Sequence, residues 1–122
     1  MCQLIWEVEY TDEFGEWWNE LTEGERESLL ASVCQLEEHG PRLPFPRSSG
    51  VATSRHQNMR ELRVQHAGNP FRVFYAFEPR RCAILLIGGD KTGDDRFYEH
   101  MVPLADRLYD AHLDAIRKEG LI

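Results

Sequence analysis

The 122-residue sequence shows neither the long apolar run typical of a membrane-spanning helix nor the pattern typical of a secretory leader. No apolar stretch reaches the roughly 18 residues of a membrane-spanning helix. The N-terminal residues, MCQLIWEVEY, have no basic region ahead of their apolar residues, so they do not predict a secretory signal. We therefore expect a cytoplasmic protein with no membrane partner, formed by a single small domain over residues 1–122.

Cysteine and metal-ligand patterns are also scarce. Cys2, Cys34 and Cys82 are too few and too scattered for a disulfide framework, and no CxxC occurs. The five histidines show neither HExxH nor another ligand spacing. We expect reduced, mostly buried thiols, no metal and no other cofactor.

Motifs for nucleotide binding and for serine catalysis are missing as well. The stretch IGGDKTG (87–93) is glycine-rich, but it does not match GxxxxGK[ST], and no nucleotide-fold pattern surrounds it. No GxSxG nucleophile motif occurs. Three aspartates lie within residues 90–95, yet basic residues are interleaved with them, which favours a solvated turn over a cation site.

The net charge of −7 argues against a nucleic-acid binder when the chain is taken as a whole. Residues 1–39, however, hold eleven acids and one base, whereas residues 40–98 hold ten bases and five acids. A polyanion would therefore be steered only to the middle segment. The alternative is that solvated surface charges merely happen to segregate along the chain.

Apolar periodicity and end signals predict an α+β domain, with an N-terminal strand and two helices, then an antiparallel β-meander and a C-terminal helix. Thr22 and Glu25 fit a capping box, and Gly40-Pro41 is typical of a helix end. The predicted elements are a strand over 4–10, helices over 12–21 and 22–39, strands over 59–66, 71–77 and 82–88, and a helix over 94–118 with a break near Pro103.

The segment 40–58 has three prolines and no periodicity, so it is predicted as a loop. Loops of this length are unusual in a compact domain, and they are commonly functional or mobile.

Arginines lie inside two of the predicted strands, where packing alone has no use for them. If AGNP (67–70) is a four-residue loop, His66 faces Phe71 and Arg63 faces Phe74. Arg63 and Arg72 are then diagonal neighbours on one face of the sheet.

The next turn predicts a third cation nearby. Pairing Phe77 with Cys82 places Arg72 opposite Ile87 and runs the last strand toward Lys91. Three cations gathered in this way repel one another unless an anion lies between them, and a phosphate would serve because arginine binds it with two hydrogen bonds. The alternative anion is Glu61, which shares the face of the arginines and would make the arrangement structural.

MRELR (59–63), followed by FRVFYAFEPRRCAILLIGGDKTG (71–93), resembles the RelE/ParE superfamily of toxin–antitoxin toxins. It is most similar to the HigB-like, phage-derived Gp49-like branch. The spacing of Phe14, Trp17, Trp18 and Leu21 fits the same family. The resemblance implies a RelE-like fold and a metal-independent endoribonuclease, an mRNA interferase that cuts mRNA on the ribosome and so inhibits translation.

The resemblance also implies roles for named residues. Arg63 and Arg72 would bind the scissile phosphate and stabilise the transition state, with Lys91 as a further basic group. Tyr98 would stack on or assist the RNA, and His100 would take a proton role. Arginine does not shuttle protons at neutral pH, so acid and base remain open among Lys91, Tyr98 and His100. The implied substrate-binding set is Arg60, Arg63, Arg72, Lys91 and Arg96.

The implied partners are a cognate antitoxin, mRNA and the ribosome. The antitoxin would cover the site with an acidic or apolar segment. The chain itself would form a homodimer, or a heterotetramer with the antitoxin. Two alternatives stay open at this point. One is a ParE-like inhibitor of DNA gyrase, which needs no catalytic site, and the other is a catalytically inactive co-repressor bound to its antitoxin.

Overall fold

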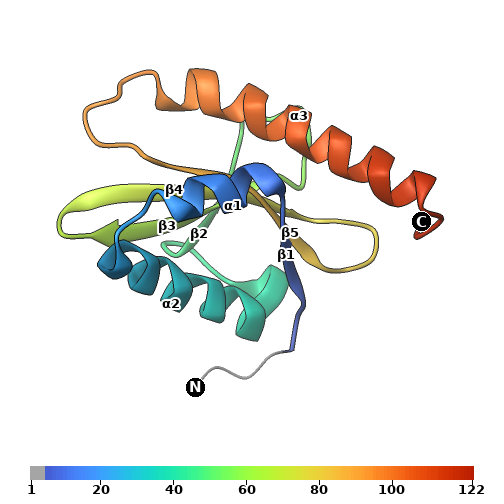
Figure 1. Cartoon of the computed structure of the whole chain (residues 1–122), viewed down its shortest axis with the longest axis horizontal. Coiled ribbons are helices and arrows are strands. Elements are labelled where there is room, and N and C mark those ends of the chain that lie inside the picture. Colours follow the sequence, from blue (N-terminus) through green and yellow to red (C-terminus); the bar gives the residue numbers. More distant parts are fainter. Residues whose placement is uncertain (1–4) are drawn as a thin grey trace.

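The computed structural model describes residues 5–122, which form a sheet covered by helices on both faces (Figure 1). In chain order the elements are β1 (Val8–Tyr10), α1 (Asp12–Asn19), α2 (Glu23–His39), the 3-10 turn η1 (Gly40–Arg42), β2 (Ser48–Gly50), β3 (Arg60–His66), β4 (Asn69–Phe77), β5 (Ala83–Asp90) and α3 (Phe97–Lys118). Apolar residues of α1 and α2 pack on one face of the sheet, and those of α3 pack on the other. The predicted α+β architecture is confirmed.

The strands follow the order β1-β5-β4-β3-β2 across the sheet. β3, β4 and β5 form the predicted antiparallel meander, whereas β1 pairs parallel with β5. β1 is shorter than the predicted strand over 4–10, of which residue 4 lies outside the described part of the chain. The segment 40–58 is less irregular than predicted, because it contains η1 and the edge strand β2.

The limits of α2 are set by local chemistry. The Thr22 hydroxyl accepts from the Glu25 amide at 3.2 Å, and the Glu25 carboxylate accepts from the Thr22 amide at 2.8 Å, so the predicted capping box is present. At the other end Gly40 has a φ of +57°. A Cβ there would lie 2.4 Å from the Trp6 indole nitrogen, so only glycine fits.

The turn between β3 and β4 is tighter than the predicted four-residue loop. Ala67 and Gly68 have φ values of 50° and 82°, as in a type I′ hairpin turn, and His66 therefore pairs with Asn69. The register predicted from His66 opposite Phe71 is wrong by two residues. A shift of two leaves every side chain on the same face, because strand side chains alternate with a period of two.

The register between β4 and β5 also differs from the predicted one. Next to the turn, Phe77 lies opposite Ala83 rather than Cys82. An irregularity between Phe74 and Tyr75 then shifts the pairing once more, so that Arg72 lies opposite Gly89. A bulge of this kind inserts an extra residue that turn-based counting cannot detect.

Helix α3 runs through Pro103 without the predicted break. A proline inside a helix leaves the carbonyl four residues earlier, here that of Glu99, without its amide partner. Both Glu99 and Pro103 are exposed to solvent, which can satisfy that carbonyl. The helix also begins at Phe97 rather than at the predicted residue 94.

Gly88 and Gly89 give two aromatic side chains access to the backbone of β5. A Cβ on Gly88 would lie 2.3 Å from the Trp17 ring, and one on Gly89 would lie 2.9 Å from the Phe97 ring. Trp17 belongs to α1 and Phe97 to the first turn of α3, so the glycine pair allows close packing of α1 and α3 on the sheet. This packing brings the start of α3 close to the carboxyl end of β5.

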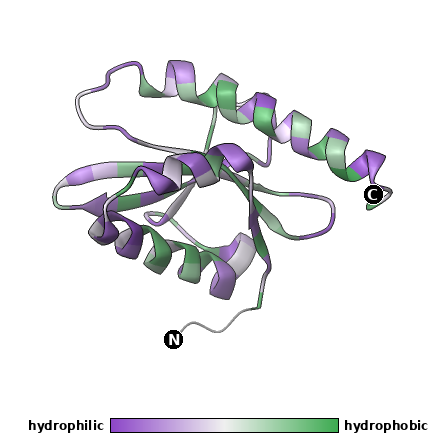
Figure 2. Cartoon of the chain, viewed as in Figure 1, coloured by the Kyte–Doolittle hydropathy of each residue, from purple (hydrophilic) through white to green (hydrophobic). Residues whose placement is uncertain are grey.

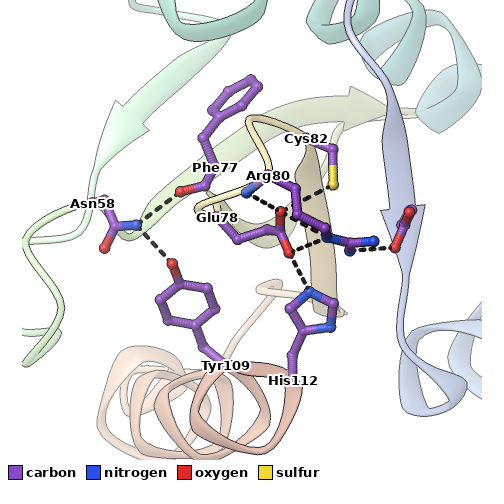
Figure 3. A network of polar contacts seen from close by, with 8 residues as sticks. Asn58, Phe77, Glu78, Arg80, Cys82, Tyr109 and His112 are labelled. Carbon is purple, nitrogen blue, oxygen red and sulfur yellow. Dashed lines mark hydrogen bonds and ion pairs between the residues drawn. The ribbon is translucent and has the colours of Figure 1, made fainter. Parts of the chain in front are cut away.

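A buried polar network ties the C-terminal part of α3 to the sheet (Figure 3). Both Glu78 carboxylate oxygens accept from Arg80 Nε, at 3.1 and 2.9 Å, and one of them lies 2.9 Å from His112 Nε2 of α3. The Cys82 thiol donates to the same carboxylate, and Arg80 also reaches Glu9 of β1. Burial acts to raise the pKa of Glu78, but the hydrogen bonds from His112, Arg80 and Cys82 outweigh it, and the pKa lies below its usual value.

Replacing Glu78 with glutamine is expected to lower the free energy of unfolding at neutral pH by about 2 kcal/mol, since charge-assisted hydrogen bonds are lost. A depressed carboxyl pKa contributes stability above the unfolded-state pKa, and that contribution is lost as pH falls through the lower folded-state value. The difference in unfolding midpoint between the two proteins should therefore shrink below about pH 4.5. Urea titrations at several pH values measure this difference. The exposed Glu99→Gln variant is the control, and an equal loss in both variants would contradict the assignment.

The cysteines differ from the sequence-based expectation in one respect. Cys82 is a free, buried thiol, as expected, and burial together with the Glu78 carboxylate raises its pKa to about 12. Cys34 is disulfide-bonded, so the expectation of a reduced thiol is wrong there, and Cys2 lies outside the described residues.

Among residues 5–122, no helix is both long and apolar enough to cross a membrane.

Candidate functional site

The acidic N-terminal third of the chain lies mainly on one face of the fold. Figure 2 shows hydrophilic residues along α1 and at both ends of α2, which together hold most of the acids of the N-terminal third. These two helices cover the face of the sheet opposite to α3. An anionic ligand is therefore repelled by the α1–α2 layer, and the α3 side is the more favourable approach.

Arg63 and Arg72 lie directly opposite each other on β3 and β4. Their strand neighbours, including Leu62, Val64 and Val73, point into the core beneath α1 and α2. Since side chains alternate along a strand, both arginines lie on the α3 face. The prediction that they share a face is confirmed, although they are direct rather than diagonal neighbours.

Glu61 lies between the two guanidinium groups. Its Oε1 is 3.6 Å from Arg72 Nε, and its Oε2 is 3.9 Å from an Arg63 terminal nitrogen. Only 6% of the Glu61 side chain is exposed, against 7% for Arg72 and 31% for Arg63. A single carboxylate thus offsets the repulsion between two cations, and Arg63 is the arginine that solvent can reach.

Tyr98, in the first turn of α3, covers this ion pair. Its hydroxyl donates to Glu61 at 2.7 Å and accepts from Arg72 Nε at 3.4 Å. Burial, followed by the hydrogen bond to Glu61, raises the pKa of Tyr98 above its usual value. The phenol is therefore protonated at neutral pH and acts as a hydrogen-bond donor.

Lys91 completes the group from the end of β5. Its Nζ lies 5.3 Å from the centroid of the Tyr98 ring, within the range of a cation–π interaction. The Lys91 amide donates to the Pro70 carbonyl at 2.8 Å, which anchors the chain after β5 to the start of β4. The structure thus brings together four predicted site residues, which we call the basic cluster: Arg63, Arg72, Lys91 and Tyr98.

Two other predicted residues lie apart from the basic cluster. His100 Nε2 is 2.9 Å from a carboxylate oxygen of Asp94, and 58% of the His100 side chain is exposed. It follows Tyr98 by two positions on α3, a spacing at which side chains do not face each other. Arg96 is 82% exposed and pairs with Glu99 one helical turn away.

Arg60 lies on the opposite face of the sheet. Its Nε donates to the Ser48 hydroxyl at 3.0 Å, and that hydroxyl is 2.6 Å from the Tyr75 hydroxyl. Tyr75 belongs to the core beneath α1 and α2. The structure therefore does not bring Arg60 to the basic cluster.

Two residues beside Arg63, Arg47 and Phe45, were not predicted from the sequence to be functional. The Arg63 amide donates to the Arg47 carbonyl at 2.8 Å, so Arg47 lies next to Arg63 just before β2. The Arg63 guanidinium carbon lies 5.3 Å from the centroid of the Phe45 ring. Neither contact could be predicted from the sequence, because both depend on β2, which is only three residues long and shows no strand pattern.

No group of three or more histidine, cysteine or carboxylate side chains suited to a metal ion occurs within residues 5–122. The hydrogen-bond donors and cations of the basic cluster are suited instead to an anion such as a phosphate. Arginine and lysine can stabilise developing negative charge, and a protonated tyrosine can donate a proton or a hydrogen bond.

The chain is similar to a known protein family and to two curated proteins. The family described as phage derived protein Gp49-like matches residues 16–110. The chain is 34% identical over 93% of its length to the putative toxin HigB2 of Mycobacterium tuberculosis, and 40% identical over 75% of its length to the putative toxin HigB3 of the same organism. The matches span 57% and 79% of those relatives, so the chain covers little more than half of the first.

Solved structures with a similar fold belong to RelE proteins. A mutant of Escherichia coli RelE in the free state has a TM-score of 0.55 at 12% identity, covering 79% of this chain and 94% of that one. The archaeal RelE–RelB complex of Pyrococcus horikoshii has a TM-score of 0.53 at 12% identity, covering 72% and 97%. The fold is therefore RelE-like, and the resemblance predicted from residues 59–93 is confirmed.

Proposed function

This chain belongs to the phage-derived Gp49-like family, and we propose that it is the toxin of a type II toxin–antitoxin module that cleaves mRNA without a metal ion. The similarity to two putative toxins and the RelE-like fold support the toxin assignment. The observation that carries the ribonuclease assignment is the basic cluster, in which Arg63, Lys91 and Tyr98 surround a buried ion pair on one face of the sheet.

RNA cleavage without a metal uses the ribose 2′-hydroxyl as the nucleophile on the adjacent phosphorus. The reaction needs transfer of the 2′-hydroxyl proton to a base, stabilisation of negative charge on the phosphoryl oxygens, and protonation of the leaving 5′-oxygen by an acid. Arg63 and Lys91 are the more accessible cations, and in this proposal they contact the scissile phosphate. Tyr98 donates its single hydroxyl hydrogen to Glu61, so in this proposal it contacts the RNA through its ring.

Arg72 has a different role in this proposal. It is almost fully buried, and its Nε lies near both the Glu61 carboxylate and the Tyr98 hydroxyl. It therefore acts as a positioning residue that fixes Tyr98 through Glu61, rather than as a direct ligand of the phosphate. Preorganised groups of this kind avoid the cost of reorientation during the reaction.

The ribosome is the proposed place of action, and a cognate antitoxin is the proposed partner. The net charge of −7 disfavours tight binding of free RNA, so presentation of mRNA by the ribosome would supply the missing affinity. RelE proteins occur in solved complexes with RelB antitoxins, which supports an antitoxin for this chain as well.

Induced expression of the chain alone is expected to arrest growth, and mapping of mRNA 5′ ends should reveal new cleavage sites within coding regions. Co-expression with the small open reading frame beside its gene should restore growth. Growth arrest with unchanged mRNA ends, accompanied by DNA damage, would instead indicate gyrase inhibition. Normal growth under strong induction would indicate an inactive co-repressor.

A further inference from the structure

Phe45 is an exposed aromatic side chain beside the basic cluster. It lies in the connection between η1 and β2, and 68% of its surface is accessible to solvent. The ring therefore offers a planar apolar face next to the positive charge of Arg63, which a ligand with an aromatic ring and an anionic group can contact.

The turn that carries Phe45 is held in place by the backbone. The amides of Arg47 and Ser48 both donate to the Pro44 carbonyl at 3.1 Å, which closes the turn around the phenylalanine. The Arg63 amide then attaches the end of this turn to β3. The ring is thus presented from an ordered segment, which lowers the entropy lost when a ligand binds to it.

The charges around Phe45 are suited to a polyanion. Arg42 and Arg47 flank it in the sequence and are exposed, and Arg63 lies over its ring. A second exposed aromatic, Tyr10, has the opposite surroundings, because it lines a groove of about 700 Å³ together with Asp12 and other acids.

We propose that Phe45 is a stacking platform for a base of single-stranded RNA, with Arg47 and Arg63 holding the adjoining phosphates. The inference rests on the proposed function for its choice of RNA as the polyanion. Every base has a planar face, and base–aromatic stacking beside arginine is a common mode of binding to single strands. The platform adds a site for a nucleotide next to the one that is cleaved.

The test uses a short RNA with 2′-O-methyl riboses, which cannot be cleaved through the 2′-hydroxyl. Its affinity is measured by fluorescence anisotropy at low salt, about 50 mM, where phosphate contacts are strong. Phe45→Leu keeps an apolar side chain but removes the ring, and it should weaken binding roughly 5- to 100-fold. Phe45→Trp should retain the affinity, and Tyr10→Leu, which removes an exposed ring from the acidic face, should not change it.

The contact between Arg47 and a phosphate is tested by the salt dependence of RNA binding. Arg47→Gln should weaken binding and reduce the slope of log affinity against log salt by about one, as expected for the loss of one phosphate contact. Arg107→Gln, which removes an exposed arginine from α3 outside the cluster, should leave the slope unchanged. Melting temperatures of all variants establish that they are folded.

The outcomes separate this inference from the proposed function. No detectable binding by the unmutated chain, or equal affinity of Phe45→Leu and the unmutated chain, would overturn the stacking platform whatever the cleavage result. A chain that binds RNA through Phe45 but cleaves none would overturn the nuclease assignment alone. If Phe45→Leu loses affinity for the antitoxin while RNA binding is unchanged, the surface is a protein contact and the proposal is wrong.

Discussion

Replacing Arg72 with alanine is expected to lower the free energy of unfolding by about 3 kcal/mol, because Glu61 would remain buried without its closest cation. For a domain of this size the loss corresponds to a fall in melting temperature of roughly 10 °C. The sequence alone predicted instead that Arg72 contacts the scissile phosphate and that its replacement leaves folding nearly unaffected, with a structural role as the alternative. The 7% exposure of the side chain favours the structural alternative.

A double-mutant cycle separates the ion pair from other effects of the substitution. Replacing Arg72 and Glu61 together by methionine removes both charges and should recover most of the lost stability, since well-packed apolar residues can substitute for a buried pair. Thermal unfolding of Arg72→Met, Glu61→Met and the double variant measures the coupling. An Arg72→Ala protein that melts like the unmutated chain yet no longer cleaves RNA would show that Arg72 is a phosphate ligand instead.

Replacing Arg63 with glutamine is expected to reduce the rate of RNA cleavage about 10²–10³-fold, the usual effect of removing one preorganised charge-stabilising group. The melting temperature should change little, because the side chain is 31% exposed and its contact with Glu61 is long, at 3.9 Å. The measurement is single-turnover cleavage of mRNA on ribosomes, which separates the chemical step from binding.

Arg60→Gln is the matched control for this experiment. Arg60 is on the same strand and carries the same charge, but it bonds to Ser48 on the opposite face of the sheet. It should leave the cleavage rate unchanged even if it lowers stability. An equal loss of cleavage in both variants would mean that the overall positive charge of β3, rather than the position of Arg63, matters for the reaction.

The sequence by itself determined which side chains share a face of the sheet. Alternation placed Phe71, Val73 and Tyr75 on one side of β4 and Arg72 on the other, and the core cluster beneath α1 and α2 contains the three apolar residues. This assignment survived a two-residue error in register, because the period of strand side chains is also two. Local signals such as the capping box of α2 were equally dependable, since they act within one helical turn.

Exact register was decided by turn and bulge geometry that the sequence only weakly encodes. Ala67 adopts a positive φ, which alanine seldom does, so the Ala-Gly turn does not carry the usual Asn-Gly or Asp-Gly signal. The shift between Phe74 and Tyr75 leaves no residue-type signature at all. Proline commonly interrupts a helix because it has no amide hydrogen to donate. Helix α3 nevertheless continues through Pro103, since this residue is exposed to solvent and α3 is held by its packing on the sheet.

The composition of the basic cluster was decided only by the tertiary structure. Tyr98 reaches Glu61 across 37 positions of the sequence, and the aromatic packing of α3 on the sheet brings the two together. Phe45 meets Arg63 because the short edge strand β2 aligns the preceding turn with β3. These contacts join residues that are far apart in the sequence, so residue periodicity cannot predict them. The sequence could therefore identify the cationic face, whereas burial of Arg72 and exposure of Arg63 and Phe45 followed only from the folded arrangement.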